Sequence, residues 1–215
     1  MSDAVALEAR LLAVAEIDDA FTGRARPSDV AAGSRAWPTS PEWSDVRLLA
    51  VTEADGRRVD EYRYTANDGS LQPVAVMFTQ EDGQPVARLY AQHHWTAGRE
   101  PMLPVDPSIH PGHGEDDALV RYFTALAAAD LEASVAAFAP DGYIQHSNGD
   151  TYQGPERLRE DFTKFYQTGP IKLRYCTMTD ANGICALEAI MPHGRPALAV
   201  YQRSGAGVEA VRLYL

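Results

Sequence analysis

The chain has 215 residues, of which 45% are hydrophobic, and it carries a formal net charge of −11 with a pI near 4.9. This hydrophobic content is ample for a packed core, whereas the acidic balance and the lack of a basic stripe argue against a nucleic-acid binder. No apolar run approaches the roughly 20 residues of a membrane span, and the N-terminus lacks the basic start and apolar centre of a signal peptide, so we expect no membrane partner and a cytoplasmic location.

The first hundred residues predict one helix, an irregular segment and four strands. Apolar residues at helical spacing favour a helix over residues 3–21, and Gly23 fits its end. Residues 24–44 contain three prolines and two tryptophans, which predicts an ordered loop that either packs its indoles on the core or lines a ligand site. Short alternating runs bounded by Asx-Gly turns then predict antiparallel strands at residues 45–53, 58–65, 72–80 and 85–95.

Residues 99–115 contain four prolines and two glycines, which predicts an extended, stiff linker. We therefore expect one domain over residues 1–98 and a second over residues 116–215.

The second half predicts three helices and a sheet. Leu119, Tyr122, Phe123 and Leu126 recur at three- and four-residue steps, as on one face of a helix, and Asp130 is a plausible N-cap for a second, shorter one. Turn residues 140–142 are expected to stop that helix before a strand at residues 143–146. A third helix is expected to begin at Pro155, and strands are expected at residues 171–179, 184–191, 195–203 and 208–215. This order indicates an α+β fold in which helices cover one face of a curved antiparallel sheet and leave a conical pocket.

Several motifs of the last hundred residues resemble the nuclear transport factor 2-like (NTF2-like) superfamily. They are Arg121-Tyr122, Asp130-Leu131, residues 135–141, residues 152–156 and Leu158-Arg159. The superfamily includes ketosteroid isomerases, SnoaL-type polyketide cyclases, limonene-epoxide hydrolases and members that only bind ligands. The resemblance implies a cone-shaped, cystatin-like fold, which by itself does not specify a chemistry.

The two halves also resemble each other. Residues 73–78 align with residues 196–201, and residues 88–90 align with residues 212–214. We infer a tandem repeat whose first copy is degenerate, because it lacks the second helix, the first strand and the third helix that would wall a pocket. Since members of this superfamily often dimerise through their sheets, the resemblance implies either an intrachain pseudo-dimer or a homodimer through the sheet faces.

The resemblance also suggests catalytic residues. In the isomerase branch a helical tyrosine donates a hydrogen bond to the substrate oxygen, a strand carboxylate moves a proton, and a second acid lies on a late strand. These positions fall on Tyr122, on His146 and near Ala199, which has no polar group. His146 can exchange a proton near neutral pH. The family alignment implies that Glu188 faces the pocket, where burial would raise its pKa and suit it to a general acid.

Other residues are candidates for substrate binding, and each catalytic candidate has a simpler interpretation. The binding candidates are the aromatic side chains of Tyr143, Tyr152, Phe162, Tyr175 and Tyr201. Tyr122 is alternatively a core aromatic residue and His146 a strand-end residue near solvent. A one-residue change of register would place Glu188 on the outer face, where it would pair with Arg174.

Three functional hypotheses follow. The first is a cofactor-free isomerase or cyclase that acts by acid–base proton transfer on a hydrophobic, oxygenated small molecule, polyketide- or steroid-like. The second is a non-catalytic module that binds a small molecule or assembles with a partner. The third is an epoxide hydrolase-like reaction, which requires an Asp–Arg–Asp set in the pocket; Arg174 with Glu188 is the nearest approach.

The sequence shows no motif for a cofactor or a metal. It contains no Gly-rich phosphate loop, no Gly-x-Ser-x-Gly and no paired-cysteine zinc spacing. Cys176 and Cys185 fall in two strands of one hairpin without lying directly opposite each other, and we expect two buried, reduced thiols.

Overall fold

The computed structural model describes residues 43–66, 69, 71–81, 84–91 and 103–214, which form two compact units divided between Pro101 and Met102. The helix predicted at residues 3–21, and all but the end of the loop predicted at residues 24–44, lie outside the described residues.

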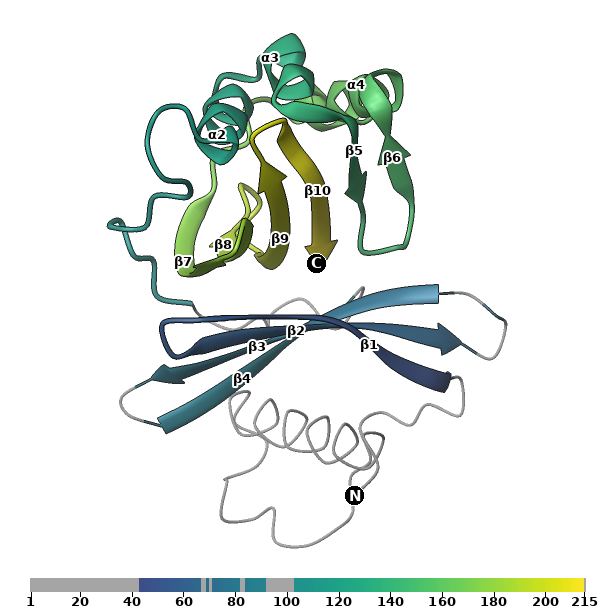
Figure 1. Ribbon diagram of the computed structural model, residues 1–215, viewed down its shortest axis with the longest axis vertical. Helices are drawn as coiled ribbons and strands as arrows, with labels where there is room; N and C mark the ends of the chain where they lie inside the picture. Colours follow the sequence, from purple (N-terminus) through teal and green to yellow (C-terminus); the bar gives the residue numbers. More distant parts are fainter. Residues whose placement is uncertain (1–42, 67–68, 70, 82–83, 92–102, 215) are drawn as a thin grey trace, which may run out of the picture. The chain divides into compact units, whose positions relative to one another are not determined.

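The first unit contains a four-stranded antiparallel sheet in the order β1-β2-β3-β4 (Figure 1). Its strands are β1 (Trp43–Ala54), β2 (Arg57–Ala66), β3 (Leu71–Glu81) and β4 (Gln84–Ala91). Asp55 and Gly56 both have positive φ (51° and 73°), as a two-residue hairpin between right-twisted strands requires. The four strands expected from the alternating pattern are therefore present.

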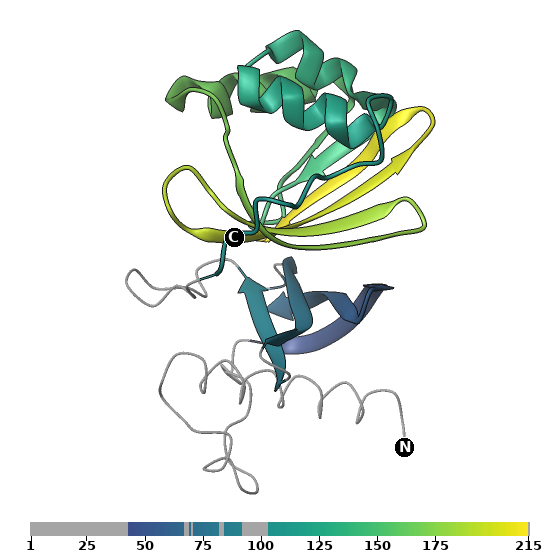
Figure 2. The ribbon, with the colours of Figure 1, turned by 90° about the vertical axis from the view of Figure 1, so that its left-hand side faces the viewer.

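The second unit packs three helices against one face of a curved six-stranded sheet (Figures 1 and 2). The helices are α2 (Ala118–Ala128), α3 (Leu131–Ala136) and α4 (Gly154–Phe165), the last followed by a 3₁₀ turn, Tyr166–Thr168. The strands are β5 (Phe138–Gln145), β6 (Thr151–Gln153), β7 (Arg174–Ala181), β8 (Ile184–Ile190), β9 (Pro196–Ser204) and β10 (Gly207–Tyr214). This confirms the predicted α+β, cone-shaped fold.

The sheet order β6-β5-β10-β9-β8-β7 differs from the expected purely antiparallel sheet in one pair, because β5 runs parallel to β10. A parallel pair needs a long crossover connection, and α4 with the four intervening strands β6–β9 supplies it. The pairing also corrects the prediction for residues 140–142, which belong to β5. Phe138 lies opposite Val208 and Tyr143 opposite Ala210, so residues 139–142 form a bulge within the strand.

Short polar contacts set the helix boundaries. Asp117 accepts a hydrogen bond from the Leu119 N–H and caps α2, and Asp130 accepts one from the Ala133 N–H (3.0 Å) and caps α3, as predicted. Pro155 lies in the first turn of α4, where its missing N–H leaves no hydrogen bond unmade.

Residues 103–117 belong to the second unit, although the sequence placed most of them in the linker. The Asp106 N–H donates to the Tyr175 carbonyl (2.9 Å), and Leu103 packs in a small apolar cluster with Cys176 and Ile190. This segment therefore contacts β7, an edge strand of the sheet, and supplies one of the backbone hydrogen bonds that an edge strand otherwise lacks.

The four strands of the first unit match β7–β10 of the second in order and in register. Under the alignment of residues 73–78 with residues 196–201, the pairs Ala75↔Tyr90 and Met77↔Arg88 correspond to Leu198↔Tyr214 and Val200↔Arg212. The equivalence extends to the other two strands, where Glu61↔Ala75 corresponds to Glu188↔Leu198 and Thr52↔Val59 to Thr179↔Ala186. Even the bulge between Leu48 and Ala50 has its counterpart between Tyr175 and Thr177. This agreement supports the tandem repeat for the four strands.

Candidate functional site

A cavity lies between the helices and the inner face of the sheet in the second unit. The space that the centre of a water-sized sphere can reach inside it measures about 60 Å³. Fourteen residues from α2, β5, α4, the segment before β7, strands β8–β10 and the residue after β8 line it: Tyr122, Leu126, Ile144, Phe162, Phe165, Ile171, Leu173, Leu187, Ala189, Met191, Ala197, Ala199, Tyr201 and Leu213.

The strand periodicity explains both the wall and the space. Side chains alternate between the faces of a strand, so β8 directs Leu187 and Ala189 to the cavity and β9 directs Ala197, Ala199 and Tyr201 there. Three of these five residues are alanines, which leave volume that larger side chains would fill.

Tyr122 and Tyr201 are the only lining residues with a side-chain hydroxyl group, and their ring centroids are 6.0 Å apart. Neither hydroxyl has a hydrogen-bond partner among the described residues. Burial raises the pKa of both phenols well above the ordinary value, and the nearby Tyr166 and Asp161 raise that of Tyr122 further. Both phenols are therefore neutral near pH 7 and can donate a hydrogen bond.

His146 lies beside the cavity and is paired with a carboxylate that the sequence reasoning missed. Its Nε2 is 3.0 Å from Oδ2 of Asp161, a residue of α4 that is 3% exposed. The His146 ring stacks on Phe165, a cavity-lining residue, with centroids 5.4 Å apart. The available signal was the position of Asp161 between Leu158 and Phe165, on the side of the helix that was predicted to be buried.

Glu188 does not face the cavity, and the prediction from the family alignment is wrong on this point. It is fully buried, and it lies on the face of β8 opposite to that of Leu187 and Ala189. The alternative interpretation, in which Glu188 lies on the outer face of the sheet, agrees with the structure in the direction of the side chain. The residue opposite Glu188 in the register is Thr177, however, whereas Arg174 lies opposite Ile190.

The structure distributes the other predicted residues differently. Phe162 and Tyr201 line the cavity, as does Ala199, where the family's late acid was expected. Tyr143 is on the face of β5 opposite to the cavity-lining Ile144, so it cannot contact a ligand there. Tyr152 and Tyr175 do not line the cavity, but they lie on the same face of the sheet as the cavity. This follows from their cross-strand partners, because Tyr152 is opposite Ile144 and Tyr175 is opposite Ala189, and both partners line the cavity.

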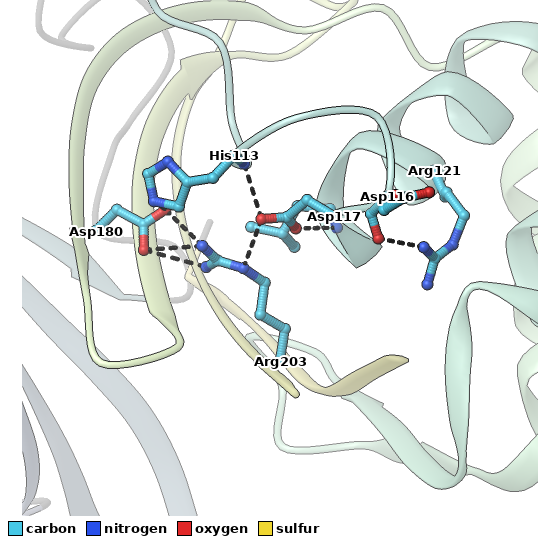
Figure 3. A network of polar contacts seen from close by, with 7 residues as sticks. His113, Asp116, Asp117, Arg121, Asp180 and Arg203 are labelled. Carbon is cyan, nitrogen blue, oxygen red and sulfur yellow. Dashed lines mark hydrogen bonds and ion pairs between the residues drawn. The ribbon is translucent and has the colours of Figure 1, made fainter. Parts of the chain in front are cut away.

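An Asp–Arg–Asp set exists, but it is not Arg174 with Glu188. Figure 3 shows Arg203 between Asp117 (Nε to Oδ2, 3.1 Å) and Asp180 (Nη2 to Oδ2, 2.9 Å). Asp117 also accepts the backbone N–H groups of His113 and Leu119 (both 2.8 Å), and His113 Nε2 is 3.4 Å from Asp180. None of these residues lines the cavity: Arg203, Asp117, Asp180, His113 and Leu119. Their contacts fasten residues 113–119 to the ends of β7 and β9.

The described residues contain no group of three or more His, Cys, Asp and Glu side chains placed to hold a metal ion. None of the helices that the structure describes is long and apolar enough to cross a membrane. Cys176 and Cys185 are buried free thiols, and Cys185 lies opposite Asp180 rather than Cys176.

No family model matches the sequence, and no curated protein matches it. Similar solved structures include a hypothetical protein with a ketosteroid isomerase-like fold from Catenulispora acidiphila, 15% identical over 46% of this chain and 84% of that one (TM-score 0.40). A putative polyketide cyclase from Sinorhizobium meliloti is 14% identical over 45% and 92% (TM-score 0.41). An uncharacterized cystatin-fold protein from Novosphingobium aromaticivorans is 15% identical over 48% and 100% (TM-score 0.42).

Proposed function

Starting from a second unit with the α+β cone fold of the NTF2-like superfamily, we propose that this unit binds a small, mostly apolar molecule that carries a hydrogen-bond acceptor. The observation that carries the proposal is the pair of hydroxyls of Tyr122 and Tyr201, which lack partners among the described residues, on an otherwise apolar cavity wall. A neutral hydrogen bond formed by such a hydroxyl contributes about 0.5–1.5 kcal/mol. A carbonyl or ether oxygen would satisfy these donors while its carbon skeleton covers the apolar wall.

The cavity volume limits the size of the part of the ligand that enters. An apolar cavity of about 150 Å³ accommodates benzene. This cavity, at about 60 Å³, is smaller. It therefore admits a few carbon atoms and one oxygen at one end of a linear molecule such as a short-chain ketone, and it is too small for the polycyclic skeleton of a steroid- or polyketide-like molecule.

The lining favours binding over proton transfer as the main function. None of the fourteen lining side chains is ionised near pH 7, because the two phenols have raised pKa values and the other twelve are apolar. A general base needs a group that gains and loses a proton near the working pH. The cavity wall offers none.

The proposal is tested by titrating the full chain with 2-hexanone and following cavity methyl signals by NMR. Tyr122→Phe should weaken binding about tenfold, because one hydrogen bond of roughly 1–1.5 kcal/mol is lost. Tyr143→Phe is the matched control, since Tyr143 faces away from the cavity. Ala199→Leu should abolish binding by filling the space. Equal affinity of wild type and Ala199→Leu would refute the cavity as the binding site.

The pair of His146 and Asp161 favours a second candidate function, proton transfer to or from a ligand atom that reaches the rim. A buried carboxylate that holds an imidazole by one nitrogen leaves the other nitrogen free to act as a general base. Tyr122 would polarise the ligand oxygen, in line with an isomerase or cyclase. In D₂O the same titration would then show exchange of the protons next to the carbonyl, lost in His146→Ala. If these protons exchange no faster than in buffer, proton transfer is refuted and binding is the only function that remains proposed.

A further inference from the structure

Next to the cavity, α4 and β6 bring together two cations and an aromatic ring. Lys164 Nζ and Arg157 Cζ are each 5.1 Å from the centroid of the Tyr152 ring, within the range of cation–π attraction. Lys164 also donates a hydrogen bond to the Tyr152 hydroxyl (3.4 Å). Arg157 and Lys164 are seven residues apart in the helix and therefore lie on one face. We call Tyr152, Arg157 and Lys164 the rim cluster.

The rim cluster adjoins the cavity through two contacts. Tyr152 lies directly opposite the cavity-lining Ile144 in the β5–β6 register, so both side chains are on the same face of the sheet. The Tyr152 ring also meets the edge of the His146 ring (centroids 5.3 Å apart), which stacks on the cavity-lining Phe165. A molecule whose tail enters the cavity beside Ile144 and Phe165 would leave its outer end near this cluster.

The charge of Lys164 is not compensated by a carboxylate among the described residues. The two nearest acids on α4 are engaged elsewhere, Asp161 with His146 (3.0 Å) and Glu160 with Arg157 (2.6 Å). The chain contains only two lysines, Lys164 and Lys172, and its net charge is −11. An ammonium without a carboxylate partner beside an apolar cavity is therefore a distinctive feature of this acidic protein.

We propose that the ligand is a small carboxylate whose tail occupies the cavity and carries there the acceptor oxygen for Tyr122 and Tyr201, while its anionic end is held at the rim by Lys164 and the Tyr152 hydroxyl. This inference rests on the proposed binding function and adds the charge and orientation of the ligand. One ammonium and one phenolic O–H match the two oxygens of a monoanion. A dianion such as a phosphate ester would bring a second negative charge, whereas Arg157, the other cation of the rim cluster, is already paired with Glu160 (2.6 Å).

The two lysines allow a direct test in the full chain. Reductive methylation with ¹³C-formaldehyde keeps the positive charge and gives one NMR signal for each lysine, assigned with Lys164→Arg and Lys172→Arg. Hexanoate should shift the Lys164 signal and leave that of Lys172, which is exposed before β7, unchanged. The neutral ligand 2-hexanone should shift cavity methyl signals without moving the Lys164 signal.

Affinities provide the second readout. Lys164→Gln should weaken hexanoate binding about threefold, as expected for one solvent-exposed ion pair, and leave 2-hexanone binding unchanged. Lys172→Gln is the matched control and should change neither affinity. The effect of Lys164→Gln should diminish at 1 M salt, because salt screens exposed charges.

The possible failures are distinguishable. If neither hexanoate nor 2-hexanone binds, the proposed function fails and this inference fails with it. If both bind equally and Lys164→Gln changes neither affinity, the cavity binds ligands but the carboxylate assignment is overturned. A Lys164 shift of the same size with inorganic phosphate would also overturn it, since the rim would then be a general anion site with no link to the cavity.

Discussion

Asp117 shows how one side chain of this protein joins three segments. Its carboxylate accepts backbone N–H groups at the start of α2 and from His113, and it binds Arg203 of β9. Burial acts to raise the pKa of Asp117, but the hydrogen bonds from Leu119 and His113 and the charge of Arg203 outweigh it and hold the pKa below the ordinary value. The ionised form is therefore favoured by the folded state.

A lowered folded-state pKa stabilises the protein above the unfolded-state value of about 3.9, and this stabilisation is lost as the pH falls through the folded-state pKa. We expect Asp117→Asn to lower the free energy of unfolding at pH 7 by about 2–4 kcal/mol, since it removes an N-cap carboxylate and leaves Arg203 one partner short. The difference from wild type should shrink below about pH 4. Urea unfolding between pH 3 and 7 measures it.

Asp116→Asn is the control for this prediction, because Asp116 is exposed and contributes only its backbone carbonyl, to Arg121. It should change the free energy of unfolding little at any pH. A loss in Asp117→Asn that is independent of pH would contradict the assigned role of its ionised form.

The candidate site illustrates what can be read from single residues. Tyr122 and Phe162 were predictable, because helical spacing identifies the side of α2 and of α4 that faces the core. Glu188 was misplaced, because the direction of a strand side chain reverses with a shift of one residue. Asp161 was missed, because a charged residue becomes informative only when its burial and its partner His146 are known.

At the scale of elements, α2 ends at a residue with an unfavourable backbone conformation. Ala129 has φ 53° and ψ 35°, in the left-handed region, and its N–H bonds to carbonyls of the last turn. Glycine is the usual residue at such a helix end, because it lacks the Cβ atom that makes this conformation costly.

We expect Ala129→Gly to increase the free energy of unfolding by about 0.5–1 kcal/mol, the relief of the Cβ clash exceeding the added entropy of the unfolded chain. Ala128→Gly, one residue earlier and inside the helix, should instead lower it by about 0.5–1 kcal/mol. Thermal unfolding followed by circular dichroism compares the two. Destabilisation by both variants would show that the left-handed conformation does not persist in solution.

The helices and strands differ in how far local patterns determined them. Asp130 and Pro155 begin α3 and α4 as expected, because capping depends on atoms within one turn. Residues 140–142 have turn chemistry and yet lie in β5, because pairing with β10 absorbs them as a bulge. A bulge depends on the partner strand, which no local pattern specifies.

At the scale of the whole molecule, the two sheets share an unusual feature. Thr52 and Thr179 occupy equivalent positions, and both hydroxyls are buried without a hydrogen-bond partner in the part of the chain that the structure describes. Burying such a hydroxyl costs desolvation free energy, and no hydrogen bond in the folded state offsets this cost. Its presence at the same place in both sheets fits an origin by duplication.

We expect Thr52→Val and Thr179→Val each to raise the free energy of unfolding by about 1 kcal/mol, because valine keeps the shape and removes the unsatisfied hydroxyl. Differential scanning calorimetry measures both variants and their combination. Thr124→Val is the control, because it removes a hydroxyl that does donate, to the Val120 carbonyl, and should not stabilise the protein. Destabilisation by both valine variants would indicate hydroxyl partners.

The sequence by itself determined the α+β class, the order of helices and strands in the second unit, and the repeat between residues 73–78 and 196–201. These features rest on side-chain periodicity, capping and turn chemistry, which act between residues close in the chain. Only the tertiary structure decided that β5 pairs in parallel with β10, that Glu188 faces away from the cavity, and that Asp161 meets His146. These outcomes depend on which distant segments pack together and in which register, and a change of one residue in register reverses them.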